Sequence, residues 1–308
     1  MEIETEKLRR MINAAAYWTL PPGIEFLLKK TLCKMTSKKK NVEKLYLSKK
    51  LIVQLKDKHL GERCFILATG PSIQEQDLTV LEGELCIAVS HFFLHKDIKR
   101  ISPRYHVLAP YHPPFSFIEL DKVFRSLNEA YEGDVTLALG HTAYEFSAYN
   151  FLQKNPEYLK KNYFFIDYSK SQPLGEVNYM LSPTWDIAKA PFQVRTVIYS
   201  AIQLAAYMGC KKIYLLGCDH DYLHDMQRVT NHHFYREEDG VSDAEHLSAF
   251  TTERWLEEYY FRWKQYRLMR EYLKSIDCDI YNSTHGGMLD VFPRVPLCEA
   301  VEHKKIDH

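Results

Sequence analysis

The stretch from Cys64 to Ile73 does most to narrow the folds open to this chain. Five of the six residues from Cys64 to Thr69 are apolar, which predicts a short strand buried on both faces. Gly70-Pro71-Ser72 then ends the strand, because glycine and proline favour a turn. Glu75 follows Ser72 at the spacing of a capping box, so we expect a helix from Ile73 with Ser72 as its N-cap. Such a corner leaves backbone N–H groups that suit a phosphate or carboxylate, although a turn without a ligand fits the same residues.

Beyond residue 60 the sequence alternates between short apolar runs and helical patterns. Short buried strands that alternate with helices are typical of a mostly parallel sheet covered on both sides. The sequence therefore predicts an α/β, doubly wound, Rossmann-like fold with a long C-terminal helix. The expected strands are Cys64–Thr69, Leu85–Val89, Tyr105–Ala109, Val135–Leu139, Tyr163–Asp167, Lys212–Gly217 and Asp279–Asn282. The expected helices are Ile73–Leu81, Phe117–Tyr131, Ala143–Leu152, Val194–Met208 and Ala244–Ile276.

Residues 1–60 differ from the rest in charge, with 14 Lys or Arg against 6 Asp or Glu in a chain of zero net charge. Pro21-Pro22-Gly23 interrupts their apolar residues before a membrane-spanning length is reached. We expect a basic amphipathic helical arm over 1–60 and a catalytic domain over 61–308. The arm's Tyr17, Trp18 and flanking cations fit an anionic membrane surface, and they also fit packing on the main domain or on another subunit.

Composition limits the class of protein. The 46% of hydrophobic residues suffices for a globular core, and the zero net charge gives no reason to expect nucleic acid as a partner. The seven cysteines are odd in number and no two have C-x-x-C spacing, which favours a reduced protein without a structural zinc site. We expect a cytoplasmic protein, with contact at the inner face of the cytoplasmic membrane and a homo-oligomer left open.

Polar residues follow six of the seven expected strands. Ligands of doubly wound folds bind beyond the carboxyl ends of the strands, so these corners are the first candidates for a site. Five of the six corners contain a histidine. The corners are Gly70-Pro71-Ser72, Ser90-His91, Tyr111-His112, Gly140-His141-Thr142, Asp219-His220-Asp221 and Asn282-Ser283-Thr284-His285.

Three of these segments carry a family resemblance. Phe65–Ile73 resembles the nucleotide corner of the bacterial sialyltransferases of glycosyltransferase family 42. Arg195–Asp219 is similar to that family's second signature, in which an arginine and a hydroxyl residue open a helix and the next strand ends in Gly-x-Asp. Ile280–Ser283 resembles its strand that ends in an Asn-Ser pair. The corner and the Gly-x-Asp strand also recur in a wider group of nonulosonic-acid transferases and hydroxymethylpterin pyrophosphokinases.

The resemblance implies a GT-A-like variant of the fold and a cytoplasmic glycosyltransferase of surface-polysaccharide or lipopolysaccharide biosynthesis. Such an enzyme moves an ulosonic acid, of the sialic acid or Kdo type, from a cytidine monophosphate (CMP) donor to a glycan acceptor without a metal or other cofactor. The family has an Asn-Gln pair where this chain has Ser90-His91. The nucleotide and donor site that it implies comprises Gly70, Pro71, Ser72, Ser90, His91, Arg195, Thr196, Asp219, His220, Asn282 and Ser283.

The resemblance also implies a general-base histidine in the loop that precedes the last long helix. His232, His233 and His246 compete for this role. We favour His233, because the aromatic pair Phe234-Tyr235 beside it could fold over the site.

Two other functions remain open from the sequence. A pyrophosphokinase of the hydroxymethylpterin type would need Mg²⁺, for which Asp219 and Asp221 would be the ligands. A catalytically silent nucleotide-binding protein of a polysaccharide pathway is the other alternative. Nucleotide binding with and without Mg²⁺ would separate the three.

Overall fold

The computed structural model describes most of the chain beyond residue 50. The chain divides between Tyr46 and Leu47, and the description concerns the second unit, Leu47–His308, alone. Residues 1–49 of the expected membrane arm and His246 lie outside the described residues. Those residues are 50–111, 115–142, 144, 147–171, 184–193, 195–225, 232–235 and 251–302.

The last residues of the expected arm, up to residue 60, pack with the main unit. Ile52 and Leu55 are buried in the core of the main unit. The backbone N–H groups of Asp57, His59 and Gly61 donate to the carbonyls of Tyr207, Met208 and Gly209. The residues just before the first strand therefore belong to the main unit, because hydrogen bonds to a distant helix end hold them there.

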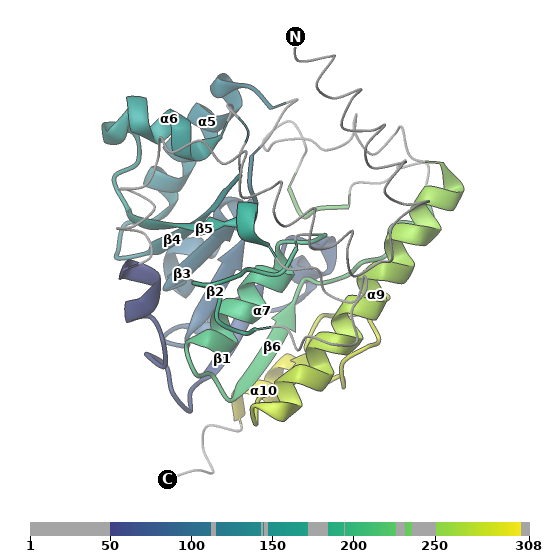
Figure 1. Cartoon of the computed structure of the whole chain (residues 1–308). Coiled ribbons are helices and arrows are strands. Elements are labelled where there is room, and N and C mark those ends of the chain that lie inside the picture. The colour runs from purple at the N-terminus through teal and green to yellow at the C-terminus, as the bar shows by residue number, and fades with distance from the viewer. Residues whose placement is uncertain are drawn as a thin grey trace. The chain divides into compact units, whose positions relative to one another are not determined.

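The described residues form one sheet of seven strands in which every strand pair is parallel (Figure 1). This confirms the predicted α/β, doubly wound class. The strands lie in the order β5-β4-β3-β2-β1-β6-β7. The strands are β1 (Arg63–Leu67), β2 (Cys86–Val89), β3 (Tyr105–Leu108), β4 (Thr136–His141), β5 (Asn162–Asp167), β6 (Lys212–Leu216) and β7 (Asp279–Asn282).

The strand order reverses direction between β1 and β6. The chain adds β2 to β5 on one side of β1 and then returns to place β6 and β7 on the other side. Crossover connections leave in opposite directions at such a switch point, so the loops beyond it separate and leave room for a ligand. The corner after β1 and the Asp219 segment after β6 therefore lie beside each other.

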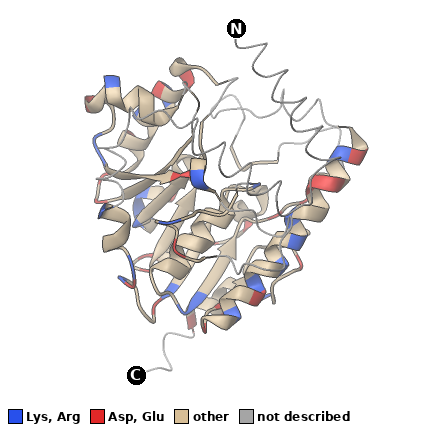
Figure 2. Cartoon of the chain, in the orientation of Figure 1, with Lys and Arg blue, Asp and Glu red and all other residues tan. Residues whose placement is uncertain are grey.

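Helices cover the sheet. All ten residues of α7 are buried, and α7 and α9 pack with one set of alternating strand residues such as Ile66, Ile87 and Ile213. Acidic side chains lie mainly near the start of α9, and basic side chains predominate along the rest of the helix (Figure 2). No helix in the described part of the chain has the length and apolar character to cross a membrane. The helices are α4 (Ile98–Ile101), α5 (Phe117–Ala130), α6 (Ala148–Lys154), α7 (Ile198–Tyr207), α9 (Thr252–Ser275) and α10 (Leu297–Glu302).

The expected helix over 73–81 is wrong. Two 3-10 turns replace it, η1 (Pro71–Glu75) and η2 (Leu78–Leu81). Ser72 is not an N-cap, since Gly70 holds that position and no side chain caps the turn. The second turn begins separately because the Asp77 side chain accepts the Thr79 N–H. A capping box of the expected kind occurs instead at Ser116 and Glu119, where α5 begins as predicted.

Candidate functional site

Three strand ends bring unpartnered polar atoms to the switch point. Asp219 follows β6, Ser72 follows β1 and Ser283 follows β7, and all three residues are buried. The Ser72 N–H donates to Asp219 Oδ1 at 3.3 Å. Asp219 Oδ2 and the hydroxyls of Ser72 and Ser283 are buried without a hydrogen-bond partner. Buried polar atoms are nearly always satisfied, so this cluster indicates a place for a ligand.

Gly70 makes room for the Asp219 carboxylate. A Cβ atom on Gly70 would lie 1.6 Å from Asp219 Oδ2 and 2.6 Å from the Gly217 carbonyl. On the other side, a Cβ on Gly287 would lie 2.7 Å from Asp219 Cα. The glycine corner therefore holds the carboxylate in place.

The backbone donors of this corner are already used, contrary to expectation. The Gly70 N–H donates to the Gly217 carbonyl and the Ile73 N–H donates to the Gly70 carbonyl. Pro71 has no N–H group, and the Ser72 N–H is taken by Asp219. Side chains rather than these backbone groups are thus available to a ligand.

The surroundings of the Asp219 carboxyl raise its pKa. Burial raises its pKa, the neighbouring Asp221 adds to the rise, and the adjacent Ser72 opposes it. A carboxylate that is desolvated in this way gains most from a ligand that donates hydrogen bonds to it.

The short segment 232–235 lies against the end of β1. The Phe234 N–H donates to the Thr69 carbonyl at 3.0 Å, and the Gln74 side chain donates to the Phe234 carbonyl at 2.9 Å. His233 Nδ1 lies 3.0 Å from Thr69 Oγ1. His233 therefore stands at the carboxyl edge of the strand that leads into the Gly70 corner.

Tyr235 connects two of the predicted site histidines. Its ring stacks on His233, with ring centroids 4.9 Å apart, and its hydroxyl lies 3.2 Å from His91 Nδ1. His91 Nε2 is buried and has no partner. Burial lowers the pKa of His91 to about 3, with smaller effects from His233 and His106, so its imidazole is neutral. The preceding Ser90 has a φ of 52°, which turns the chain after β2.

The other candidate bases are placed differently. His232 is buried, with Nδ1 3.9 Å from Asp221 Oδ1 and its ring against Tyr222. His246 cannot be placed, since it lies outside the described residues.

Two predicted site residues use their side chains for internal contacts. His220 Nε2 lies 2.8 Å from the Tyr266 hydroxyl of α9, so this nitrogen is used within the protein. The Asn282 side chain donates to the Leu289 carbonyl at 2.7 Å and accepts the Thr284 N–H at 3.0 Å. Asn282 therefore positions the loop after β7 rather than offering a free polar group.

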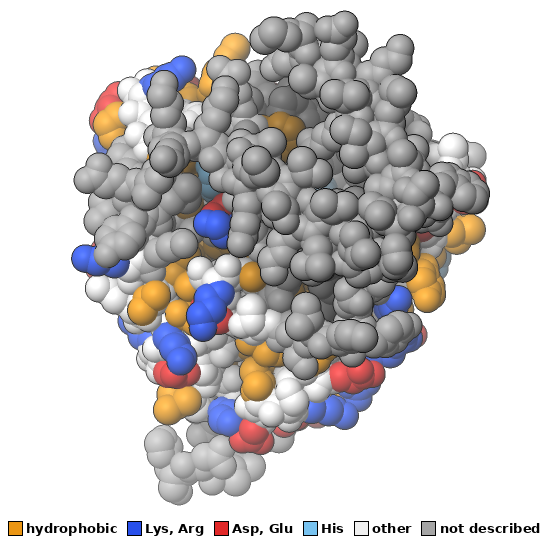
Figure 3. All heavy atoms as spheres, in the orientation of Figure 1, with side chains coloured by type: hydrophobic (Ala, Val, Ile, Leu, Met, Phe, Trp, Pro, Cys, Tyr) orange, Lys and Arg blue, Asp and Glu red, His pale blue; other side chains and the backbone are white. Residues whose placement is uncertain are grey.

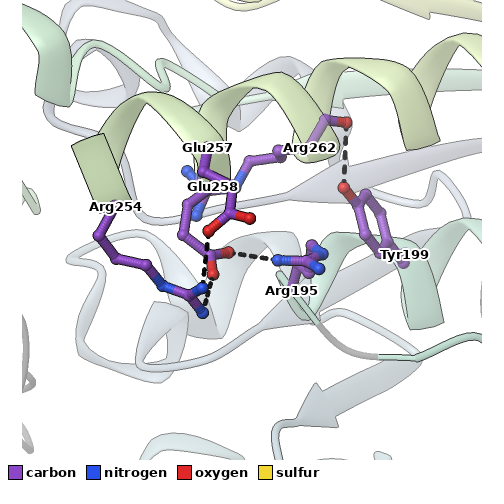
Figure 4. Close-up of polar contacts among 6 residues, drawn as sticks. All are labelled: Arg195, Tyr199, Arg254, Glu257, Glu258 and Arg262. Carbon is purple, nitrogen blue, oxygen red and sulfur yellow. Dashed lines mark hydrogen bonds and ion pairs between the residues drawn. The ribbon is translucent and has the colours of Figure 1, made fainter. Parts of the chain in front are cut away.

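Arg195 also has a partner within the protein. Its Nη1 lies 2.6 Å from Glu258 Oε2, and its guanidinium lies over the Phe261 ring at 4.8 Å (Figure 4). Arg254 binds the other oxygen of Glu258 at 2.5 Å. Thr196 accepts the Ile198 N–H at 3.4 Å, just before α7 begins. Arg195 thus joins α7 to α9, and sequence reasoning missed Glu258 because it lies 63 residues away.

Metal binding is not indicated by the described residues, which contain no group of three His, Cys, Asp or Glu arranged to hold an ion. In the space-filling view, basic and acidic side chains of described residues are mixed over the lower part of the surface, without a cluster of one sign (Figure 3). A metal-free reaction stays a prediction.

The fold and this edge define an α/β protein with a polar site at the switch point of a parallel sheet. No family model and no curated protein matches the sequence. Solved structures of the sialyltransferase CstII from Campylobacter jejuni are similar to the chain. The complex with the substrate analogue cytidine-5'-monophosphate has 14% identity and a TM-score of 0.45, covering 77% of this chain and 85% of that chain. A complex of the sialyltransferase CST-II with a trisaccharide acceptor and CMP has 15% identity and a TM-score of 0.40, covering 77% of this chain and 88% of that chain.

Proposed function

We propose that this protein is a glycosyltransferase that moves an ulosonic acid from a CMP donor to a glycan acceptor. The observation that carries the proposal is the set of unpartnered polar atoms on Asp219, Ser72 and Ser283 at the switch point. The same three residues belong to the segments that resemble family 42 sialyltransferases. A nucleotide supplies the hydroxyl and amino donors that Asp219 Oδ2 lacks.

The serine hydroxyls complete this recognition. Each can donate one hydrogen bond and accept others, so Ser72 and Ser283 suit ribose hydroxyls or phosphate oxygens. They come from opposite sides of Asp219, which lies between β1 and β7 in the strand order. A ligand bound at Asp219 would therefore meet donors and acceptors from three strand ends.

His233 is the base in this proposal. Transfer breaks the bond from the sugar's anomeric carbon to the phosphate and forms a bond from that carbon to an acceptor oxygen. CMP leaves with the electron pair of the broken bond, and the acceptor hydroxyl gives its proton to the imidazole. His233 is only partly buried, and its Nδ1 lies 3.0 Å from Thr69 Oγ1 at the carboxyl end of β1.

The acceptor that we propose is a surface glycan, and the reaction needs no cofactor. Sialic acid and Kdo are the donor sugars that the resemblance favours. Contact of the N-terminal arm with the inner face of the membrane belongs to the same proposal.

Thermal-shift measurements with CMP provide the test. We expect CMP to raise the melting temperature without added Mg²⁺, and Asp219→Asn to remove most of this rise. The exposed Asp134→Asn is the matched control and should respond like the unmodified protein. A rise with adenosine triphosphate only in the presence of Mg²⁺ would support a pyrophosphokinase instead. No response to any nucleotide would support a non-catalytic role.

A further inference from the structure

Arg262 of α9 forms no ion pair with a described residue. The residue is half-buried, and its Nε is buried without a hydrogen-bond acceptor. The ion pairs that α9 makes with described residues use Arg254, Glu257 and Glu258 and leave Arg262 out. Its backbone carbonyl, by contrast, accepts the Tyr199 hydroxyl (Figure 4). The helix is thus anchored at this residue while the guanidinium remains available.

The other partly buried arginines of the described residues all have an acceptor. Arg63 pairs with Glu84, Arg195 pairs with Glu258, and Arg270 donates to the Val291 carbonyl. A desolvated charge is costly unless it is paired, so proteins rarely leave one in this state without a reason. Arg262 differs from these arginines in the way expected of a residue whose partner is a ligand.

The surroundings of Arg262 connect it to the strand-end site. Its guanidinium lies over the Tyr259 ring at 5.3 Å, and the Tyr259 hydroxyl donates to the His220 carbonyl at 3.3 Å. His220 directly follows Asp219. The charge of Arg262 also adds to the effect of burial in lowering the pKa of His220. Arg262 therefore lies next to the loop that leaves β6.

A second unsatisfied side chain adjoins Arg262 on the helix. Gln265 is fully buried, and neither its amide nitrogen nor its amide oxygen has a hydrogen-bond partner. Residues three apart on a helix are neighbours on its surface, so Gln265 and Arg262 can reach one group together. Two adjacent side chains thus lack partners on the flank of α9 that meets α7 and the Asp219 loop.

We propose that Arg262 and Gln265 form an anion site for the donor substrate, taking over the role that the sequence assigned to Arg195. The inference rests on the proposed function, because the donor is what brings the anion. The ligand is a phosphate or carboxylate group. Arg262 neutralises its charge with the planar fork of the guanidinium, and the Gln265 amide donates to a second oxygen.

Arg262→Met tests the proposal, since it keeps the apolar stem over Tyr259 and removes the charge. Arg267→Met is the matched control, because Arg267 lies on the same helix and is exposed. Calorimetry with CMP, cytidine and free sialic acid gives the readout. We expect Arg262→Met to weaken binding of an anionic probe by about tenfold or more. We expect the melting temperature to stay nearly the same, since no ion pair with a described residue is lost.

The probes identify the anion. Weaker CMP binding with unchanged cytidine binding assigns Arg262 to the phosphate, whereas weaker sialic acid binding with unchanged CMP binding assigns it to the carboxylate. Unchanged affinity for all probes would overturn the proposal, as would an equal loss in Arg267→Met. If the unmodified protein binds neither CMP nor cytidine, the proposed function fails, and inorganic phosphate becomes the probe. Stabilisation by phosphate that Arg262→Met removes would then keep the anion site, and no difference would reject it.

Discussion

The switch point and the Glu258 ion-pair network differ in how their carboxylates are satisfied. At the switch point Asp219, Ser72 and Ser283 each hold a buried polar atom without a partner. In the ion-pair network the Glu258 carboxylate binds Arg195 with one oxygen and Arg254 with the other. Both regions lie on the same fold and use similar residue types.

This difference separates residues that maintain the fold from residues that are available to bind a ligand. Removing one member of a satisfied network leaves its partner without a hydrogen bond or ion pair, so such a change lowers the stability of the protein. Removing a polar atom that has no partner leaves no other group unsatisfied. Such a change should therefore affect ligand binding with little loss of protein stability. Arg262 lies within one turn of Glu258 and follows the second pattern. The four predictions below test this division.

The largest expected effect concerns the base. His233→Ala should lower turnover roughly a hundredfold to ten-thousandfold while CMP affinity stays nearly unchanged, because the base contacts the acceptor hydroxyl. Steady-state transfer assays with calorimetry measure both quantities. The exposed His224→Ala is the control, and His232→Ala should do much less than His233→Ala. Full turnover in His233→Ala would remove this residue from the mechanism.

Gly70→Val should cost about 3 kcal/mol of stability, at the upper end for overpacked interiors. A Cβ atom there would already lie 1.6 Å from Asp219 Oδ2, so the valine must displace the carboxylate or the backbone. Urea unfolding measures the loss, with Gly133→Val as the control because the nearest atom to a Cβ there is 3.8 Å away. Equal stability of the two variants would show that the corner is more open than the structure indicates.

Glu258→Gln should destabilise the protein by about 2 to 3 kcal/mol, because two arginines lose a carboxylate that is only 12% exposed. The neighbouring Glu257→Gln is the control. Its carboxylate is 50% exposed and binds Arg254 alone, so its loss should stay within about 0.5 kcal/mol. If both variants unfold at the same urea concentration, the Arg195 network does not maintain the contact.

Acid should destabilise the protein through three buried histidines. Burial lowers the pKa of His91 and His220 to about 3 and that of His106 to about 4, against an ordinary value of 6.5. The unfolded chain therefore binds protons first, and stability falls as the pH drops from about 6.5 towards 4. Each histidine contributes up to about 2 kcal/mol at pH 5.

Urea unfolding at pH 7 and pH 5 measures this loss, and His91→Gln should reduce it. Asp219 acts in the opposite direction, because its raised pKa favours the protonated folded state as the pH falls. Equal stability at the two pH values would contradict the prediction.

Local sequence patterns determined the framework of this protein. Each of the seven strands was expected close to where it lies, and β7 (Asp279–Asn282) has the expected bounds. Apolar runs of strand length next to glycine and polar residues suffice for this, because burial depends on the segment itself. Parallel pairing then fixes one edge where all strand ends meet, so the region of the candidate site also followed from the sequence.

The tertiary structure decided which polar groups at that edge are satisfied internally. Arg195 meets Glu258 from 63 residues away, and Ser72 meets Asp219 from 147 residues away. His220 meets Tyr266 from 46 residues away. A side chain's local sequence sets its chemistry but not its partner, because hydrogen bonds and ion pairs form between whatever groups the packed helices and strands bring within about 3 Å.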